Sequence, residues 1–135
     1  LEFILEKFIT KNNLGELFDA PYDVYFDNEN VVQPDLLFIS KDSLHIIGEK
    51  NVHGAPDLVI EIISENSAYR DMVQKKKLYA KFGVKEYWVV IPEGEEIEIY
   101  TLKDKTFQLY KTYGKDNTLE SSLLEGLKIG LIKIF

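Results

Sequence analysis

The chain contains no cysteine among its 135 residues. This absence excludes disulfide bonds and thiolate metal sites, and it is typical of a reducing compartment, so we expect a cytoplasmic protein. Long apolar runs are absent too, since none approaches the roughly 18 residues that cross a bilayer. The chain also does not start with a basic segment followed by an apolar one, the pattern of a secretory signal. We therefore expect no membrane partner.

Several motifs of catalytic chemistry are missing as well. The only histidines, His45 and His53, do not stand in HxH or HExxH spacing, so they are poor candidates for metal ligands. The sequence has no GxxxxGK[ST], GxGxxG or GxSxG motif, which leaves phosphate-loop chemistry and a serine nucleophile without support. The net charge of −7 argues against a general nucleic-acid coat protein. It does not exclude a nuclease, because divalent cations neutralise carboxylates locally.

What is present is the pattern of one α/β (α+β) domain spanning residues 1–135, with a mixed central sheet flanked by helices. The apolar spacing predicts a helix that ends near Asn12, and a second helix over 68–82 closed by Gly83. The two strands that this second helix joins should run parallel. Strands are predicted over the ranges 21–26 and 31–40 (as a hairpin), 56–64, 84–91, and 96–101 with 107–111 as an antiparallel meander. We further expect a strand or turn at 44–47, a loop at 114–122 and a short strand or tail at 127–135.

Glu61 lies in the middle of the apolar run from Leu58 to Ile63. A charged carboxylate there is costly unless it is paired, hydrogen-bonded or bound to a metal, and an ion pair with a lysine or a helix end is the simplest explanation. Asp57 is four residues away, about 13 Å along a strand, so the two cannot hold one ion together. A partner carboxylate must come from another strand. Asp35 is a candidate, because Pro34 before it favours a bulge that redirects the next side chain into a cleft; the alternative is an aspartate that merely ends a turn before a strand.

Helix geometry separates the basic residues of the 68–82 segment. At 100° per residue, Lys75 falls on the apolar stripe that faces the sheet, and Lys76 lies on its flank as the second choice. A lysine on that stripe either extends past the core to solvent or meets a buried carboxylate. The stripe is formed by Ala68, Met72, Tyr79 and Phe82, and the opposite, solvated face by Arg70, Gln74, Lys77 and Lys81.

Two carboxylates and a lysine are the components of a magnesium-dependent phosphodiesterase. Hard divalent cations bind carboxylate oxygens and keep several water ligands. A bound cation polarises the phosphoryl oxygen and activates water, while a lysine orients that water or stabilises the developing charge. Asp35, Glu61 and Lys75 are therefore our candidate catalytic residues.

Three segments in fixed order carry a family resemblance: QPDLLFIS, GAPDLVIEIIS and RDMVQKKKLYAKFGVKEYWVV. Together they resemble the Uma family of restriction-endonuclease-like proteins in the PD-(D/E)XK nuclease superfamily. The resemblance covers nearly the whole chain and is densest from Val31 to Ile91. It implies a restriction-endonuclease-like fold and a metal-dependent site that cleaves DNA. Members of the family usually begin with a further N-terminal stretch, so we expect that this chain lacks a leading segment.

The resemblance also assigns roles. Pro34-Asp35 resembles the PD of the superfamily and Glu61 its second acidic residue, but Ile63 stands where the plain motif has lysine. The Uma family is thought to supply that lysine from the next helix, in a D-x-x-x-K-x-x-x-Y pattern that Asp71, Lys75 and Tyr79 match. Asp57 also belongs to the motif, and we take it as a residue at the rim or a second choice of metal ligand.

These observations predict a DNA endonuclease that uses Mg²⁺ or Mn²⁺. Asp35 and Glu61 would hold the metal, with Asp71 and Tyr79 in support. Arg70, Lys77 and Lys81 would contact the phosphate backbone. Cutting both strands of a duplex would require a homodimer or repeated encounters. The alternative is a catalytically inactive domain of the same fold, whose acidic surface binds a protein partner.

Overall fold

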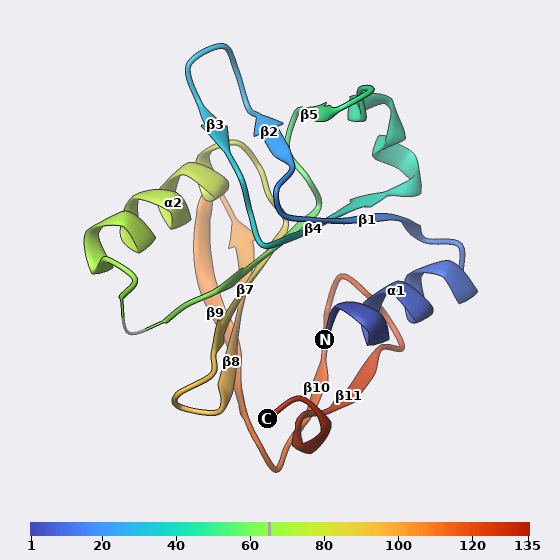
Figure 1. Cartoon of the computed structure of the whole chain (residues 1–135), viewed down its shortest axis with the longest axis vertical. Coiled ribbons are helices and arrows are strands. Elements are labelled where there is room, and N and C mark those ends of the chain that lie inside the picture. Colours follow the sequence, from blue (N-terminus) through green and yellow to red (C-terminus); the bar gives the residue numbers. More distant parts are fainter. Residues whose placement is uncertain (65) are drawn as a thin grey trace.

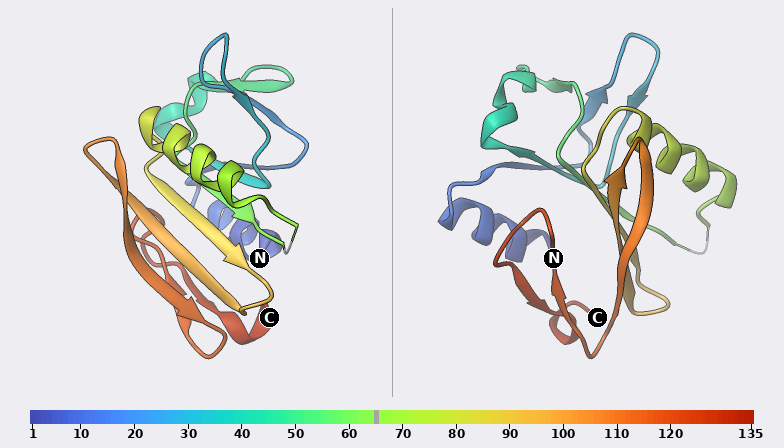
Figure 2. Two further views of the ribbon diagram at one scale, coloured as in Figure 1. Left: turned by 90° about the vertical axis from the view of Figure 1, so that its left-hand side faces the viewer. Right: turned by 180° about the vertical axis from the view of Figure 1, so that it is seen from behind.

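The computed structural model describes residues 1–64 and 66–135. Its centre is a six-stranded sheet in the order β1-β4-β6-β7-β8-β9 (Figure 1). Helix α1 and the C-terminal β10–β11 pair lie on one side of this sheet, and helix α2 lies on the other (Figures 1 and 2). The strands of the sheet are Gly15–Asp19 (β1), Leu36–Ser40 (β4), Leu58–Ile62 (β6), Glu86–Ile91 (β7), Glu96–Lys103 (β8) and Thr106–Gly114 (β9). The predicted mixed sheet flanked by helices is confirmed.

Strands β6 and β7 form the buried middle of the sheet. They pair in parallel with Ile60 opposite Trp88, as predicted for two strands joined through a helix. Because successive side chains point to opposite faces, Leu58 and Ile60 pack in the cluster that includes α1, whereas Val59 packs in the cluster beneath α2. Glu61 has the parity of Val59 and therefore faces α2.

Helix α2 spans Tyr69–Lys81 and agrees with its predicted range to within one residue at each end. Gly83 follows it with a φ of +91°, the left-handed conformation expected for a residue that ends a helix. Met72 and Tyr79 face the sheet as predicted, and the Phe82 ring stacks on Phe26 with centroids 4.9 Å apart. Ala68 is instead exposed at the N-cap, because the chain is still extended there.

The predicted strand over 31–40 is wrong as a single element. Its first part, Val31–Val32 (β3), pairs with Asp23–Tyr25 (β2), and the rest forms β4, which pairs with β1 and β6 in the large sheet. Pro34 lies in the break, where its lack of an N–H interrupts the ladder. β2 also pairs in parallel with Asn51–His53 (β5), giving a separate three-stranded sheet. Strand β1 was not predicted from the sequence.

The antiparallel β8–β9 meander is confirmed, with a register shift at Ile99/Tyr100. The expected loop at 114–122 contains Thr118–Glu120 (β10), which pairs with Lys128–Gly130 (β11), and a 3₁₀ turn at Leu131–Lys133 (η2) follows. The expected strand or turn at 44–47 lies mostly within a 3₁₀ helix, Lys41–Ile46 (η1). Helix α1 spans Glu2–Lys11. Within residues 1–64 and 66–135, no helix is both long and apolar enough to cross a bilayer.

Candidate active site

A polar pocket of about 410 Å³ lies where the start of β4, the end of β6 and the first half of α2 meet. Asp35, Glu61 and Lys75 all line this pocket, although they come from three separate elements. Asp71 lines it as well. The other lining residues are Gln33, Ile62, Ile63, Asn66, Ser67, Ala68, Met72 and Tyr87.

The pairing of β4 with β6 explains how two carboxylates far apart in sequence come together. The strands are antiparallel with Leu36 opposite Ile60, so the residue before Leu36 lies beside the residue after Ile60. These residues are Asp35 and Glu61. One oxygen of Asp35, Oδ2, accepts a hydrogen bond of 2.7 Å from the backbone N–H of Ile62, which fixes this carboxylate at the end of β6.

Glu61 is the buried member of the pair, with 8% of its surface exposed. Its Oε1 accepts a hydrogen bond of 2.5 Å from the Tyr79 hydroxyl. Burial raises the pKa of Glu61, the Tyr79 hydrogen bond and the positive charge of Lys75 lower it, and the neighbouring Asp35 raises it further, for a net rise. The surroundings of Glu61 therefore favour its neutral form more than water does.

Helix α2 presents Asp71, Lys75 and Tyr79 at intervals of four residues, and hence on one face. Asp71 and Lys75 reach the pocket, whereas Tyr79 is fully buried behind Glu61. The Tyr79 ring contacts Phe26 and Tyr87, with centroids 6.0 and 5.4 Å away. Burial, followed by the charge of Glu61, raises the pKa of Tyr79, so the phenol stays a proton donor to the carboxylate. Lys75 is half-buried against the pocket rather than turned to open solvent.

Asp57 is not brought to this pocket. It is buried just before β6, where its Oδ1 lies 3.2 Å from the Lys85 ammonium and its Oδ2 accepts a 2.7 Å hydrogen bond from the Ser40 N–H. These contacts join β4 to the segment that leads into β7, which is a structural role. Arg70, Lys77 and Lys81 are exposed along α2 outside the lining of the pocket, as expected for its solvated face.

Gln33 and Tyr87 belong to the pocket but were not among the sequence candidates. Gln33 lies in the break before Asp35, and its Nε2 donates a 2.6 Å hydrogen bond to Asp23 of β2. Tyr87 is buried on β7 and its pKa is raised, first by burial and then by the charge of Glu61. The signal that would have found Tyr87 is its alternation in β7, which puts it on the same face of the sheet as Val59 and Glu61.

The donor set of the pocket suits a hard divalent cation. Asp35 and Glu61 supply carboxylate oxygens, and in the described part of the chain no group of three or more Asp, Glu, His or Cys side chains is arranged to hold an ion. Magnesium is commonly bound by one or two carboxylates while it retains waters and takes up substrate phosphate oxygens. A bound cation would stabilise the charged form of Glu61, which burial disfavours. Mg²⁺ and Mn²⁺ both match these oxygen ligands.

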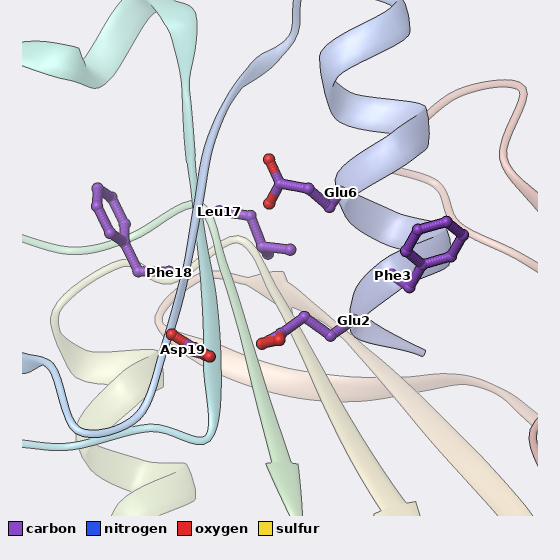
Figure 3. Close-up of a pocket in the computed structure, with 6 residues that line it drawn as sticks. All are labelled: Glu2, Phe3, Glu6, Leu17, Phe18 and Asp19. Carbon is purple, nitrogen blue, oxygen red and sulfur yellow. The ribbon is translucent and has the colours of Figure 1, made fainter.

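A second pocket, between α1 and β1, has the opposite electrostatic character (Figure 3). Glu2, Glu6 and Asp19 line it together with Phe3, Leu17 and Phe18, so the lining contains no basic side chain. Figure 3 shows Glu2 extending from α1 toward Asp19, and burial followed by this neighbour raises the pKa of Glu2. A phosphate group would be repelled there. The pocket that contains Lys75 is the better candidate for phosphodiester chemistry.

The chain is similar to known proteins in its sequence pattern and in its fold. The model of the Uma2 family, described as "Putative restriction endonuclease", matches residues 1–131. The fold is similar to the crystal structure of a protein from Anabaena variabilis that is described as a "putative nuclease" belonging to DUF820. The TM-score is 0.77 at 14% identity, and the match covers 98% of this chain and 74% of that one. At this identity the likeness concerns the fold. A search of curated proteins finds no match.

Proposed function

Because the chain belongs to the Uma2 family of restriction-endonuclease-like proteins, we propose that it is a DNA endonuclease that hydrolyses phosphodiester bonds with Mg²⁺ or Mn²⁺. The observation that carries the proposal is the meeting of Asp35, Glu61 and Lys75 in one polar pocket, on a nuclease-like fold. The two carboxylates would hold the cation. When bound, the cation neutralises charge on the phosphate and lowers the pKa of a water ligand.

Lys75 is proposed to act on the reacting groups directly. Its side chain lines the same pocket as the two carboxylates, and its ammonium would donate hydrogen bonds to the attacking water and to the phosphate oxygens. The water oxygen attacks phosphorus and loses a proton to solvent, while the bond from phosphorus to the leaving oxygen breaks and that oxygen takes up a proton from solvent to leave as a hydroxyl group. Removal of one such preorganised donor typically slows the chemical step by about 10²- to 10³-fold.

Tyr79 and the Ile62 N–H are positioning groups in this proposal. The Tyr79 hydroxyl donates to Oε1 of Glu61, and the Ile62 N–H donates to Oδ2 of Asp35. Each carboxylate thus has one oxygen held by a protein donor. This restraint keeps both groups in the geometry that the reaction needs without further reorganisation.

The substrate would approach along α2, which carries five basic residues and one acidic residue in a chain of net charge −7. Arg70, Lys77 and Lys81 are exposed there and are proposed to contact phosphates. One active site cleaves one DNA strand at a time. Cleavage of a duplex would therefore need two copies acting together as a homodimer, or one copy acting twice.

Nicking of supercoiled plasmid tests the proposal. The wild type should nick in millimolar Mg²⁺ or Mn²⁺ and stop when the metal is chelated, whereas Asp35→Asn and Glu61→Gln should be inactive while remaining folded. Lys50→Ala is a matched control, because Lys50 is exposed and outside this pocket. Nicking that survives in Asp35→Asn and Glu61→Gln would assign the activity to a contaminant or to another site. No nicking by the wild type would favour an inactive binding domain.

A further inference from the structure

A second hollow adjoins the proposed active site, between α2 and β8. Its volume is about 240 Å³, and Met72 and Tyr87 line both this hollow and the active-site pocket, so the two are neighbours. It is lined by Tyr69, Met72, Val73, Lys76, Tyr87, Val89, Glu98 and Tyr100. The catalytic role proposed above uses none of the residues Tyr69, Lys76, Glu98 and Tyr100.

The walls of this hollow are mainly apolar and aromatic, and its two charged residues, Lys76 and Glu98, both contact Tyr100. The Lys76 ammonium lies 3.7 Å from the centroid of the Tyr100 ring, and the Tyr100 hydroxyl donates a 3.1 Å hydrogen bond to Glu98. Lys76 and Glu98 thus offer a donor and an acceptor beside flat apolar surfaces. A nucleobase has this same composition: two π faces, with donors and acceptors along its edge.

Tyr69 is the available stacking surface. It is the first residue of α2, and 81% of its surface is exposed, the largest value among the exposed large hydrophobic side chains. The other aromatic residues of the hollow already have partners: Tyr87 stacks on Phe107 at 5.6 Å, and Tyr100 lies beneath Lys76. Proteins that bind single strands combine exposed aromatic rings, on which bases stack, with nearby basic groups.

We propose that this hollow binds one unpaired nucleobase next to the scissile phosphate, with Tyr69 stacking on the base and Lys76 and Glu98 contacting its edge. The inference rests on the proposed nuclease function and specifies its substrate as a strand with unpaired nucleotides. In an intact duplex the faces of each base are covered by its neighbours, so only a base outside the stack can enter. A carboxylate acceptor at the edge favours bases that carry an amino group.

The test is binding of a fluorescently labelled single-stranded oligonucleotide, followed by anisotropy with the metal chelated so that nothing is cleaved. Tyr69→Ala should weaken binding by about 5- to 150-fold, the range expected for loss of one stacked base, and Tyr69→Phe should bind like the wild type. Tyr110→Ala is the matched control, because Tyr110 is 49% exposed on β9 and lies outside the hollow. Binding of the same sequence as a duplex should change little in Tyr69→Ala.

The outcomes separate this inference from the proposed function. Equal losses in Tyr69→Ala and Tyr110→Ala, or a loss in Tyr69→Phe as large as in Tyr69→Ala, would overturn the stacking role even if plasmid nicking is observed. Tyr69-dependent binding by a protein that nicks nothing would support the base pocket and contradict the nuclease. A wild type that binds no single strand would overturn the inference and leave Tyr69 as a contact for a protein partner. Thermal unfolding of each variant shows that it is folded.

Discussion

Replacing Tyr79 with phenylalanine tests how far Glu61 depends on its hydrogen bond. The substitution removes only the hydroxyl that donates to Oε1 of Glu61, while the ring keeps its packing against Phe26 and Tyr87 and leaves no large cavity. A hydrogen bond to a charged group contributes about 1.5–3 kcal/mol to stability. At roughly 2.1 cal/mol/K per residue, the entropy of unfolding of 135 residues is about 0.28 kcal/mol/K. The melting temperature should therefore fall by about 5–10 °C.

The effect should depend on pH in a direction set by Glu61. The hydroxyl stabilises the charged carboxylate most, so Tyr79→Phe should be most destabilised above the folded-state pKa of Glu61, which burial raises. The deficit should shrink as the pH falls through that pKa, because a hydrogen bond to a neutral carboxyl contributes only about 0.5–1.5 kcal/mol. Differential scanning fluorimetry from mildly alkaline to mildly acidic pH measures this, with Tyr110→Phe as an exposed control. A deficit that is absent, or that grows on acidification, would refute the reasoning.

Two further substitutions locate the metal. Glu61→Gln should raise the melting temperature of the metal-free protein at mildly alkaline pH, because a carboxyl with a raised folded-state pKa loses stability as the pH rises through that pKa. It should also abolish the stabilisation by magnesium. In the wild type, magnesium at ten times its dissociation constant should add about 1.4 kcal/mol to the free energy of unfolding and raise the melting temperature accordingly. If this magnesium shift in melting temperature is unchanged in Glu61→Gln, Glu61 is not a metal ligand. Asp57→Ala should lower stability by about 1–3 kcal/mol, because it leaves the partly buried Ser40 N–H without its acceptor, yet it should keep the magnesium shift. The ion pair between Asp57 and Lys85 contributes little to stability, because the Lys85 side chain is 62% exposed. Loss of the magnesium shift in Asp57→Ala would instead place the metal near Asp57, at the start of β6.

Much of the fold could be predicted from local periodicity in the sequence. The apolar run around Glu61 and the helical spacing around Lys75 are contained within single elements, so each could be recognised without knowing its neighbours in space. The same spacing separated Lys75, which lines the active-site pocket, from Lys77, which does not. The parallel pairing of β6 and β7 followed from the connecting helix.

Non-local pairing limited what could be predicted. β1 has only five residues and a mixed burial pattern, and it is defined mainly by its pairing with β4. Pro34 suggested an irregularity, but the sequence could not show that the strand divides there between two sheets. The position of Asp35 beside Glu61 depends on the β4–β6 register, across 26 residues of sequence. Tyr87 lines the pocket because of its position on β7, and no sequence motif marks this residue.

The measurement that tests the central claim most directly is the single-turnover nicking rate of Lys75→Ala in saturating magnesium, beside the wild type and Lys50→Ala. We predict a loss of about 10²-fold or more in Lys75→Ala, because the side chain acts on the reacting phosphate, with an unchanged rate in Lys50→Ala. Binding of DNA in the absence of metal should persist in Lys75→Ala, since Arg70, Lys77 and Lys81 remain. A rate for Lys75→Ala equal to that of the wild type would contradict a catalytic lysine on α2.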